Sequence, residues 1–579
     1  MTKAERNISI LVALLATFAG GVIFFTSLAA VIDSYAPVPF HDEWDMLANW
    51  DQVKSHTGSA LWSIYDQHNE HRIAVPRLLF FSDIFLFDGK GYLNLAGIFV
   101  VQILNALLIT LLIVRAIPLP TFIRIATFGF VFCAMFSTLQ FNNLFWGFQF
   151  QFVSVFWFAA LAFIFLSDRA PATSQHKNAT VSFPQALGIL FSIVASFTMA
   201  NGLLTWVIGL AIGLRDRWKW GKLSFFLSVA TVVFWFYFRD YRPVTGHTNP
   251  IDALQTPWLL FQYAALYLGH SLSPWNERFA TILGGIAIVL TCFLFVVFFT
   301  DKNNRVFRTK ETRVLISISA FILATALITG LGRLSFGIEQ ATSGRYATPS
   351  LIFWITLAGT LGSISLVERI FRWLSRGMAA YICATVFLVV VSYQANWIQA
   401  KHDWKTRKMA AASALLTNIF DDSYLRAVYP RPKRLQELNE VLERRGLSFY
   451  SIDWANLPGK RITEHFISTT ATTCRGHIDA VDDVESDDNG FRLHGWAVDT
   501  DTSRPSETVV FATEDSDIVG IAFTGRPRSD VEKLYPGIKD SGWFGHARVN
   551  PGQRITAYAL VEGGRSACQL KGQFNRPQH

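Results

Sequence analysis

Long apolar runs recur through the chain up to residue 396 and then stop. The first run, at 8–32, carries no charge and is long enough to cross a bilayer as a helix, which takes about 20 residues. The further candidate spans are 92–115, 121–138, 151–167, 184–199, 202–214, 222–238, 278–300, 314–331, 349–367 and 377–396. Only 16% of the residues are charged, which is low for a soluble protein. The sequence therefore predicts a polytopic α-helical membrane protein with about 11 transmembrane helices.

Some of these spans are open to a second interpretation. A cleaved signal peptide is the alternative for 8–32, but the run exceeds the usual apolar region of about 7–15 residues, so we favour a retained helix. The short pair 184–199 and 202–214, around FTMANGLL, is either two spans or one broken helix that lines a cavity. Lys3 and Arg6 precede the first run, which predicts a cytoplasmic N-terminus.

The charges of the loops support this threading. Basic clusters at 215–222, 301–313 and 367–376 all fall on one side, as the positive-inside rule requires of cytoplasmic loops. The opposite side receives 33–91, 139–150, 239–277, 332–348 and everything after 396. These clusters account for the net charge of +8 without a basic stripe, so no nucleic acid is expected as a partner. No P-loop is present, which argues against an ATP-driven machine.

The chain divides into a transmembrane domain, 1–400, and a soluble part. Residues 401–470 hold two helical stretches, KMAAASALLTNIF and RLQELNEVLERRG, separated by the prolines of YPRPK. We interpret this segment as a juxtamembrane helical connector. Residues 471–579 change to alternation with period two, as in GFRLHGWAVD, between Gly, Asp, Asn and Pro turns. This pattern predicts an extracytoplasmic β-sandwich.

Two cysteines and two tryptophans of the β domain are candidates for specific roles. Cys474 and Cys568 bracket the domain, whereas the other three cysteines lie within predicted spans. We expect a disulfide and hence an oxidising compartment; the alternative is two unrelated free thiols. Trp496 and Trp543 are candidates for stacking on sugar rings, and the alternative is that both belong to the core.

The first outer loop, 33–91, opens with three carboxylates in HDEWD, namely Asp42, Glu43 and Asp45. The loop holds nine acidic and four basic residues, opposite in sign to the whole chain. One explanation is a helix over 43–54 with Asp42 at its N-cap, where the dipole favours negative charge. A cap accounts for one carboxylate only. The group is therefore also a candidate general base for a hydroxyl that attacks a sugar carbon at the membrane surface.

Other polar residues of the outer loops are candidates for a substrate pocket: His68, Glu70, His71, Asn142, Asn143 and Trp146. For the rings around Trp146, an aromatic belt is the alternative. His68 and His71 lack the HExxH spacing, so no metal site is predicted. Arg72, Arg333 and Arg345 are candidates for binding a phosphate. For the arginines at 332–348, pairing with Glu339 or interfacial snorkelling is the alternative.

This combination resembles the GT-C class of integral-membrane glycosyltransferases, which have many spans, an acidic first outer loop and a soluble outer C-terminal domain. HDEWD is similar to the acidic signature of the class, and SGRYATPS is similar to a loop that carries a phosphate-contacting arginine in related bacterial enzymes. The resemblance covers the whole architecture, but its motifs are short. It implies a polyprenyl-phosphate sugar as donor, a first-loop carboxylate (Asp42, Glu43 or Asp45) as base, and Arg345 as a phosphate ligand.

The implied reaction is direct displacement of polyprenyl phosphate by a hydroxyl of a glycan or glycolipid acceptor. No cofactor is required and a divalent cation is optional. The expected location is a bacterial inner membrane, with the C-terminal domain in the periplasm. Three alternatives remain: a polysaccharide ligase or oligosaccharyltransferase with a lipid-diphosphate donor, a lipid or glycan transporter, and a binding or scaffold protein with a β module.

Overall fold

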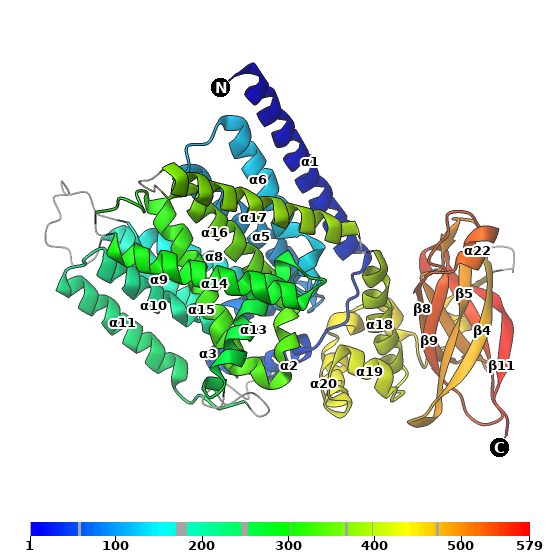
Figure 1. The fold of residues 1–579 in the computed structure, drawn as a ribbon. Helices are drawn as coiled ribbons and strands as arrows, with labels where there is room; N and C mark the ends of the chain where they lie inside the picture. The colour runs from blue at the N-terminus through cyan, green and yellow to red at the C-terminus, as the bar shows by residue number, and fades with distance from the viewer. Residues whose placement is uncertain are drawn as a thin grey trace. The chain divides into compact units, whose positions relative to one another are not determined.

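The computed structural model describes residues 2–55, 60–168, 182–244, 253–301, 303–364, 369–395, 398–469 and 474–578. The chain is mostly helical and ends in a β domain (Figure 1). It forms two compact units. The helical unit comprises Met1–Val31, Ala60–Leu79 and Asn94–Trp397, and the mixed unit comprises Ile32–Ser59, Phe80–Leu93 and Ile398–His579. Two segments of the predicted first outer loop thus group with the C-terminal part of the chain.

Within the described residues, eight helical stretches are long and apolar enough to cross a membrane, which indicates a multi-pass membrane protein. They are Lys3–Asp33, Tyr92–Ala116, Thr121–Phe145, Gly147–Leu166, Trp220–Phe238, Glu277–Thr300, Lys310–Phe336 and Ile370–Gln394. The other three predicted spans match shorter helices, so the number of eleven stays a prediction. These helices are α9 (Phe183–Ser196), α10 (Leu204–Arg215) and α16 (Ala347–Ser363). The predicted ends at 367 and 396 lie outside the described residues.

The interior of the helical unit is built around α15 (Lys310–Arg333) and α16. All residues of α16 from Ala347 to Leu361 are buried, which explains how a short apolar helix is accommodated without facing lipid along its length. A further apolar helix, α13 (Pro257–Gly269), forms in the segment 239–277, which the sequence predicts as an outer loop. It packs against α14 (Glu277–Thr300) and α15.

The helices of the mixed unit include α2 (Asp42–Lys54), α18 (Ile398–Leu416), α19 (Asp422–Val428) and α20 (Pro432–Arg445). Helix α20 follows its sequence pattern closely: Pro432 begins it, and Leu435, Leu438 and Leu442 form its buried face. Gly446 ends it in the left-handed conformation (φ 61°). Of the two stretches predicted to be helical in the connector, RLQELNEVLERRG matches α20 up to Arg445, and KMAAASALLTNIF is helical only up to Leu416, where α18 ends. Its predicted end at 470 lies outside the described residues, as does the predicted start of the β domain at 471.

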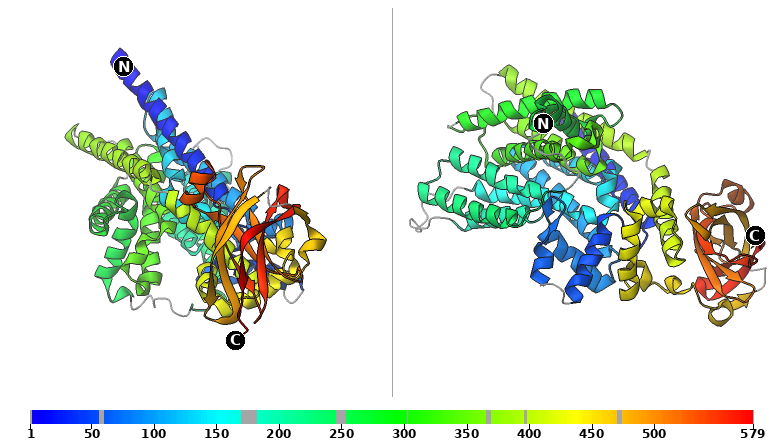
Figure 2. Two further views of the ribbon diagram at one scale, coloured as in Figure 1. Left: turned by 90° about the vertical axis from the view of Figure 1, so that its right-hand side faces the viewer. Right: turned by 90° about the horizontal axis from the view of Figure 1, so that it is seen from below.

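The C-terminal strands form one sheet in the order β10, β7, β8, β9, β5, β4, β11, and β10 also pairs with β11, so the sheet closes into a β-barrel (Figure 2). The strands are β3 (Ile467–Thr469), β4 (Cys474–Val484), β5 (Asp487–Asp499), β6 (Arg504–Pro505), β7 (Thr508–Thr513), β8 (Ile518–Arg526), β9 (Gly542–Arg548), β10 (Arg554–Val561) and β11 (Ser566–Asn575). The domain is a barrel and not the predicted sandwich. The sequence could not distinguish the two architectures, because the strands of both have the same period-two pattern.

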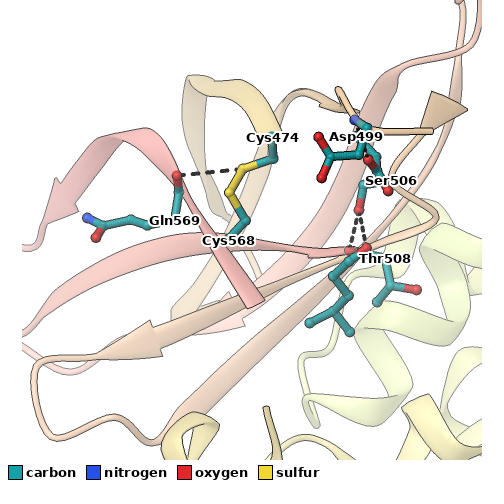
Figure 3. The surroundings of a disulfide bond; sticks show 8 residues. Cys474, Asp499, Ser506, Thr508, Cys568 and Gln569 are labelled. Carbon is teal, nitrogen blue, oxygen red and sulfur yellow. Dashed lines mark hydrogen bonds between the residues drawn. A yellow bond between two sulfur atoms is a disulfide. The ribbon is translucent and has the colours of Figure 1, made fainter. Parts of the chain in front are cut away.

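The predicted disulfide between Cys474 and Cys568 is present and joins β4 to β11 (Figure 3). Both cysteines belong to the barrel core. Beside the bridge, the hydroxyl of Ser506 donates to the carbonyls of Thr508 and Leu560. The bridge reinforces a place in the barrel where the strand pairing is sparse, since β4 and β11 pair at Lys571 and His477 alone within the described residues.

Candidate functional site

The acidic motif forms the first turn of α2, and the residue before it has a strained backbone. His41 adopts φ 49° and ψ −118°, a conformation that is rare for a residue with a Cβ. Its N–H donates to the carbonyl of Val428 at 2.7 Å, which fixes the entry to the helix. Asp42 is then the first helical residue and is half-buried. Such strain persists only where the surrounding structure enforces it, and it concentrates at functional sites.

Glu43, and not Asp42, provides the cap-like contact of this helix. The backbone N–H of Phe40 donates to Glu43 Oε2 at 2.8 Å. The predicted N-cap at Asp42 is therefore displaced by one residue, because the chain turns at His41. Glu43 also lies close enough to Lys408 of α18 for their charges to interact.

Lys408 is a residue of this site that the sequence did not indicate. Its side chain is only 8% exposed and lies 5.7 Å from the ring centre of Trp404. Burial lowers the pKa of the Lys408 ammonium, and the negative charge of Glu43 acts in the opposite direction. A lysine within KMAAASALL would ordinarily be assigned to a solvated helix face. Only the packing of α18 reveals its burial.

Asp45 is held by Tyr429, whose hydroxyl lies 3.2 Å from each carboxylate oxygen. Burial raises the pKa of Tyr429, and the negative charge of Asp45 raises it further. Arg431 donates to the same hydroxyl at 3.4 Å. Between the acids, the indole of Trp44 is fully buried and packs edge-on to Phe449. Glu43 and Asp45 thus each help to hold α2 in place, so three carboxylates remain close together on one anchored turn.

In the helical unit, the β1 (Gln67–His68) and β2 (His71–Arg72) hairpin carries Glu70 and His71. Glu70 forms an ion pair with Arg333 at the end of α15, and His71 Nε2 lies 3.7 Å from Glu70 Oε1. Glu70 is thus the partner of Arg333, and Glu339 is not among the ion pairs of the described residues. The pair brings a predicted pocket residue and a predicted phosphate-binding residue together.

These residues line a cavity of about 110 Å³ that lies wholly within the helical unit. Its polar wall is formed by Glu70, His71, Asn201, Arg333 and Arg345, and its apolar wall includes Phe152, Phe156, Met199, Ile328 and Pro349. The cavity therefore combines two guanidinium groups with an aromatic and aliphatic lining. That combination suits a ligand with an anionic group and an apolar part.

Arg345 sits in a loop that the predicted pocket residues support. Asn143 Nδ2 donates to the Arg345 carbonyl at 3.0 Å and to Thr348 Oγ1 at 2.7 Å. A Cβ on the adjacent Gly344 would lie 3.4 Å from the amide of Asn142. The Arg345 guanidinium lies 5.7 Å from the ring centres of both Trp146 and Phe152. The structure thus places Asn142, Asn143 and Trp146 close to Arg345, but these three residues do not line the cavity, and their role in a substrate pocket stays a prediction.

Arg72 and His68 lie elsewhere in the helical unit. Arg72 is 3% exposed, and its guanidinium donates to the backbone carbonyls of Tyr237, Tyr65 and Arg239. These bonds give Arg72 a structural role at the end of α11 (Trp220–Phe238) and leave it occupied by protein acceptors. His68 packs its ring 5.1 Å from that of Phe148. Neither residue lines the cavity.

The two tryptophans of the barrel differ. Trp543 is 0% exposed and belongs to the barrel core, so it has no face for a sugar in this structure. Trp496 is half-buried and packs against Tyr535, with ring centres 6.2 Å apart. Trp543 is therefore a core residue, as the alternative interpretation proposed. A sugar-stacking role for Trp496 stays a prediction.

The described part of the chain contains no cluster of three or more His, Cys, Asp or Glu side chains that could hold a metal ion. Comparison with known protein families, with curated proteins and with solved structures found no match. Function is therefore argued from the residues themselves. The carboxylates Asp42, Glu43 and Asp45 belong to the mixed unit, and Arg333 and Arg345 belong to the helical unit.

Proposed function

We propose that this protein is a GT-C-type glycosyltransferase that moves a sugar from a polyprenyl-phosphate donor to a glycan or lipid acceptor of the cell envelope. The cavity of the helical unit carries the proposal, because Arg333 and Arg345 share it with an apolar wall. A lipid phosphate has the matching chemistry: an anion that accepts bidentate hydrogen bonds from arginine and a chain that prefers apolar surroundings.

A first-loop carboxylate supplies the base in this proposal, and we prefer Asp42. It takes the proton from the acceptor hydroxyl as that oxygen forms a bond to the anomeric carbon. The bond from the anomeric carbon to the phosphate oxygen breaks, and polyprenyl phosphate leaves with the electron pair. Arg345 and Arg333 stabilise the charge that develops on this leaving group. Because the leaving group is a stable monophosphate, the reaction needs no nucleotide or redox cofactor.

Asp42 is preferred over its neighbours because of its position. It directly follows the strained His41 and is the first residue of α2. The proposed location is the bacterial inner membrane, with the N-terminus in the cytoplasm and the barrel in the periplasm. The basic loops on one predicted side and the disulfide support this orientation.

The decisive experiment measures release of polyprenyl phosphate by the purified protein from a panel of polyprenyl-phosphate sugars, with candidate acceptors supplied. Asp42→Asn is expected to lower turnover by about 10²–10⁴-fold, the usual contribution of a general base. Glu43→Gln and Asp45→Asn report whether a neighbouring acid is the base instead. Asp88→Asn, in the same loop, is the matched control and is expected to keep normal turnover.

The alternatives give different outcomes. Turnover with lipid-diphosphate donors only would identify a polysaccharide ligase or oligosaccharyltransferase. No turnover with either donor class, combined with passage of a labelled lipid or glycan across liposomes, would identify a transporter. Either result would contradict the proposed use of a monophosphate donor.

A further inference from the structure

The interruption between α9 and α10 contributes one wall of the cavity. Helix α9 ends at Ser196, Met199 is extended (φ −161°, ψ 154°), and the short helix η3 (Ala200–Leu203) precedes α10. Met199, Ala200 and Asn201, within FTMANGLL, line the cavity. Backbone of this kind is tolerated at membrane depth where it lines a cavity.

The interruption is a packed and fixed feature. A Cβ on Gly202 would lie 1.8 Å from the Ala195 carbonyl oxygen, so only glycine allows this close approach. The indole N–H of Trp206 donates to Ser196 Oγ at 3.0 Å and ties α10 to the end of α9. The N–H of Val75 also donates to the Phe197 carbonyl at 3.0 Å. Asn201 is therefore held in one position at the cavity wall.

In the side-chain amide of Asn201, Nδ2 makes a hydrogen bond and Oδ1 has no hydrogen-bond partner within the described residues. The side chain is 4% exposed, and its Nδ2 donates to Thr325 Oγ1 at 3.3 Å. The Thr325 hydroxyl proton is itself donated to the Phe321 carbonyl at 2.9 Å, so Thr325 Oγ1 can only accept from Asn201. This fixes the amide orientation and leaves Oδ1 as the other end. Within the described residues, nothing donates a hydrogen bond to Asn201 Oδ1.

A buried carbonyl without a donor costs about 1–3 kcal/mol, so a ligand group that donates to it gains binding free energy. The missing group must be a donor. Arg333 is paired with Glu70 in this cavity, and the remaining positive charge of Arg345 disfavours a ligand ammonium, which leaves a hydroxyl or an amide N–H. Sugars carry hydroxyl groups, and N-acylated amino sugars also carry an amide N–H.

We infer that Asn201 is a specificity-determining residue whose Oδ1 accepts a hydrogen bond from a hydroxyl or amide N–H of the sugar on the lipid donor. The assignment of the lipid rests on the proposed function. The requirement for a donating group rests only on the geometry of Asn201 and Thr325. In this arrangement the arginines bind the phosphate and Asn201 distinguishes a sugar-bearing lipid from the bare lipid phosphate.

The test uses the full-length protein in a detergent without a sugar head group and measures binding by calorimetry. The probes are polyprenyl phosphate, polyprenyl-phosphate hexoses and pentoses, and alkyl glycosides without phosphate. Asn201→Leu keeps the side-chain size and removes the acceptor. Asn94→Leu is the matched control, because Asn94 also has a buried, unpaired Oδ1 but lies outside the cavity.

Asn201→Leu is expected to weaken binding of the preferred sugar lipid about tenfold, which corresponds to one lost hydrogen bond of about 1.4 kcal/mol. Binding of bare polyprenyl phosphate is expected to stay within about twofold, and Asn94→Leu is expected to change neither affinity. Equal weakening of both lipids by Asn201→Leu, or no weakening of either, would overturn the inference in favour of a structural or water-filled position.

The proposed function and the inference fail separately. If the wild-type protein binds no polyprenyl-phosphate lipid but binds an alkyl glycoside in an Asn201-dependent way, the proposed donor is wrong and the inference holds. If bare polyprenyl phosphate binds and no sugar lipid of either kind does, the inference is overturned.

Discussion

Removal of the disulfide is expected to destabilise the barrel strongly. The bridge between Cys474 and Cys568 spans a sequence separation of 94 residues. For a loop of this length, the chain-entropy model gives about 15.6 cal/mol/K of lost entropy in the unfolded chain, or about 4.7 kcal/mol at 25 °C. With a urea m value of about 1.5 kcal/mol/M, the unfolding midpoint falls by about 3 M. The variant is the double substitution Cys474→Ser and Cys568→Ser.

The assay is urea titration of the full-length protein in detergent, with pulse proteolysis to follow unfolding of the barrel under non-reducing conditions. Cys292→Ser is the matched control, because Cys292 is a free, exposed cysteine within a candidate span, and it is expected to leave the midpoint unchanged. A midpoint shift below about 0.5 M in the double variant would refute the reasoning. It would mean that strand pairing alone closes the barrel.

Two further predictions concern buried charges of the mixed unit. Asp421→Asn is expected to lower the free energy of unfolding by about 3–5 kcal/mol at pH 7 in the same urea assay. Asp421 is fully buried and accepts hydrogen bonds from Arg492 (2.6 and 2.8 Å) and His546 (3.0 Å), which the substitution weakens. Although burial acts to raise its pKa, the bonds from His546 and Arg492 hold the pKa of Asp421 below the usual range. Its stabilisation is therefore present above about pH 4 and lost as the pH falls below that, so the difference between variant and wild type should shrink at pH 3. Lys408→Met is expected to keep or raise the urea midpoint, since burial lowers the pKa of Lys408 and penalises its charge. A lower midpoint would show instead that the charge interaction of Lys408 with Glu43 stabilises the mixed unit.

The predictable parts of the fold are those that local pattern determines. Leu435, Leu438 and Leu442 recur at helical spacing between Pro432 and Gly446, and the structure has α20 with those bounds. The barrel was not predictable in the same way. Alternation with period two is identical in a sandwich and a barrel, and closure depends on the pairing of β10 with β11, which no single strand encodes.

The candidate site shows the same division. The three acids of HDEWD lie within four positions, so one turn of a helix holds all of them, and their clustering is predictable from the sequence. The partner of Asp45 is Tyr429, 384 positions away, and that of Glu70 is Arg333, 263 positions away. Asn201 depends on Thr325 for the orientation of its amide. Such pairings arise from tertiary packing, which carries no signal in a single sequence.

Hydrogen-bond satisfaction distinguishes Arg72 from Asn201 in the helical unit. Arg72 and Asn201 are almost equally buried, and the sequence singles out only the arginine as a site residue. Arg72, however, donates to three carbonyls of the protein, so a phosphate would have to displace bonds that hold α11. Asn201 lines the cavity, and within the described residues no group donates to its Oδ1, so a ligand donor there would break no hydrogen bond of the protein. The unpaired Oδ1 of Asn201 costs free energy as long as nothing donates to it. A ligand hydroxyl that binds there removes this cost, so Asn201 can discriminate between ligands with and without such a group.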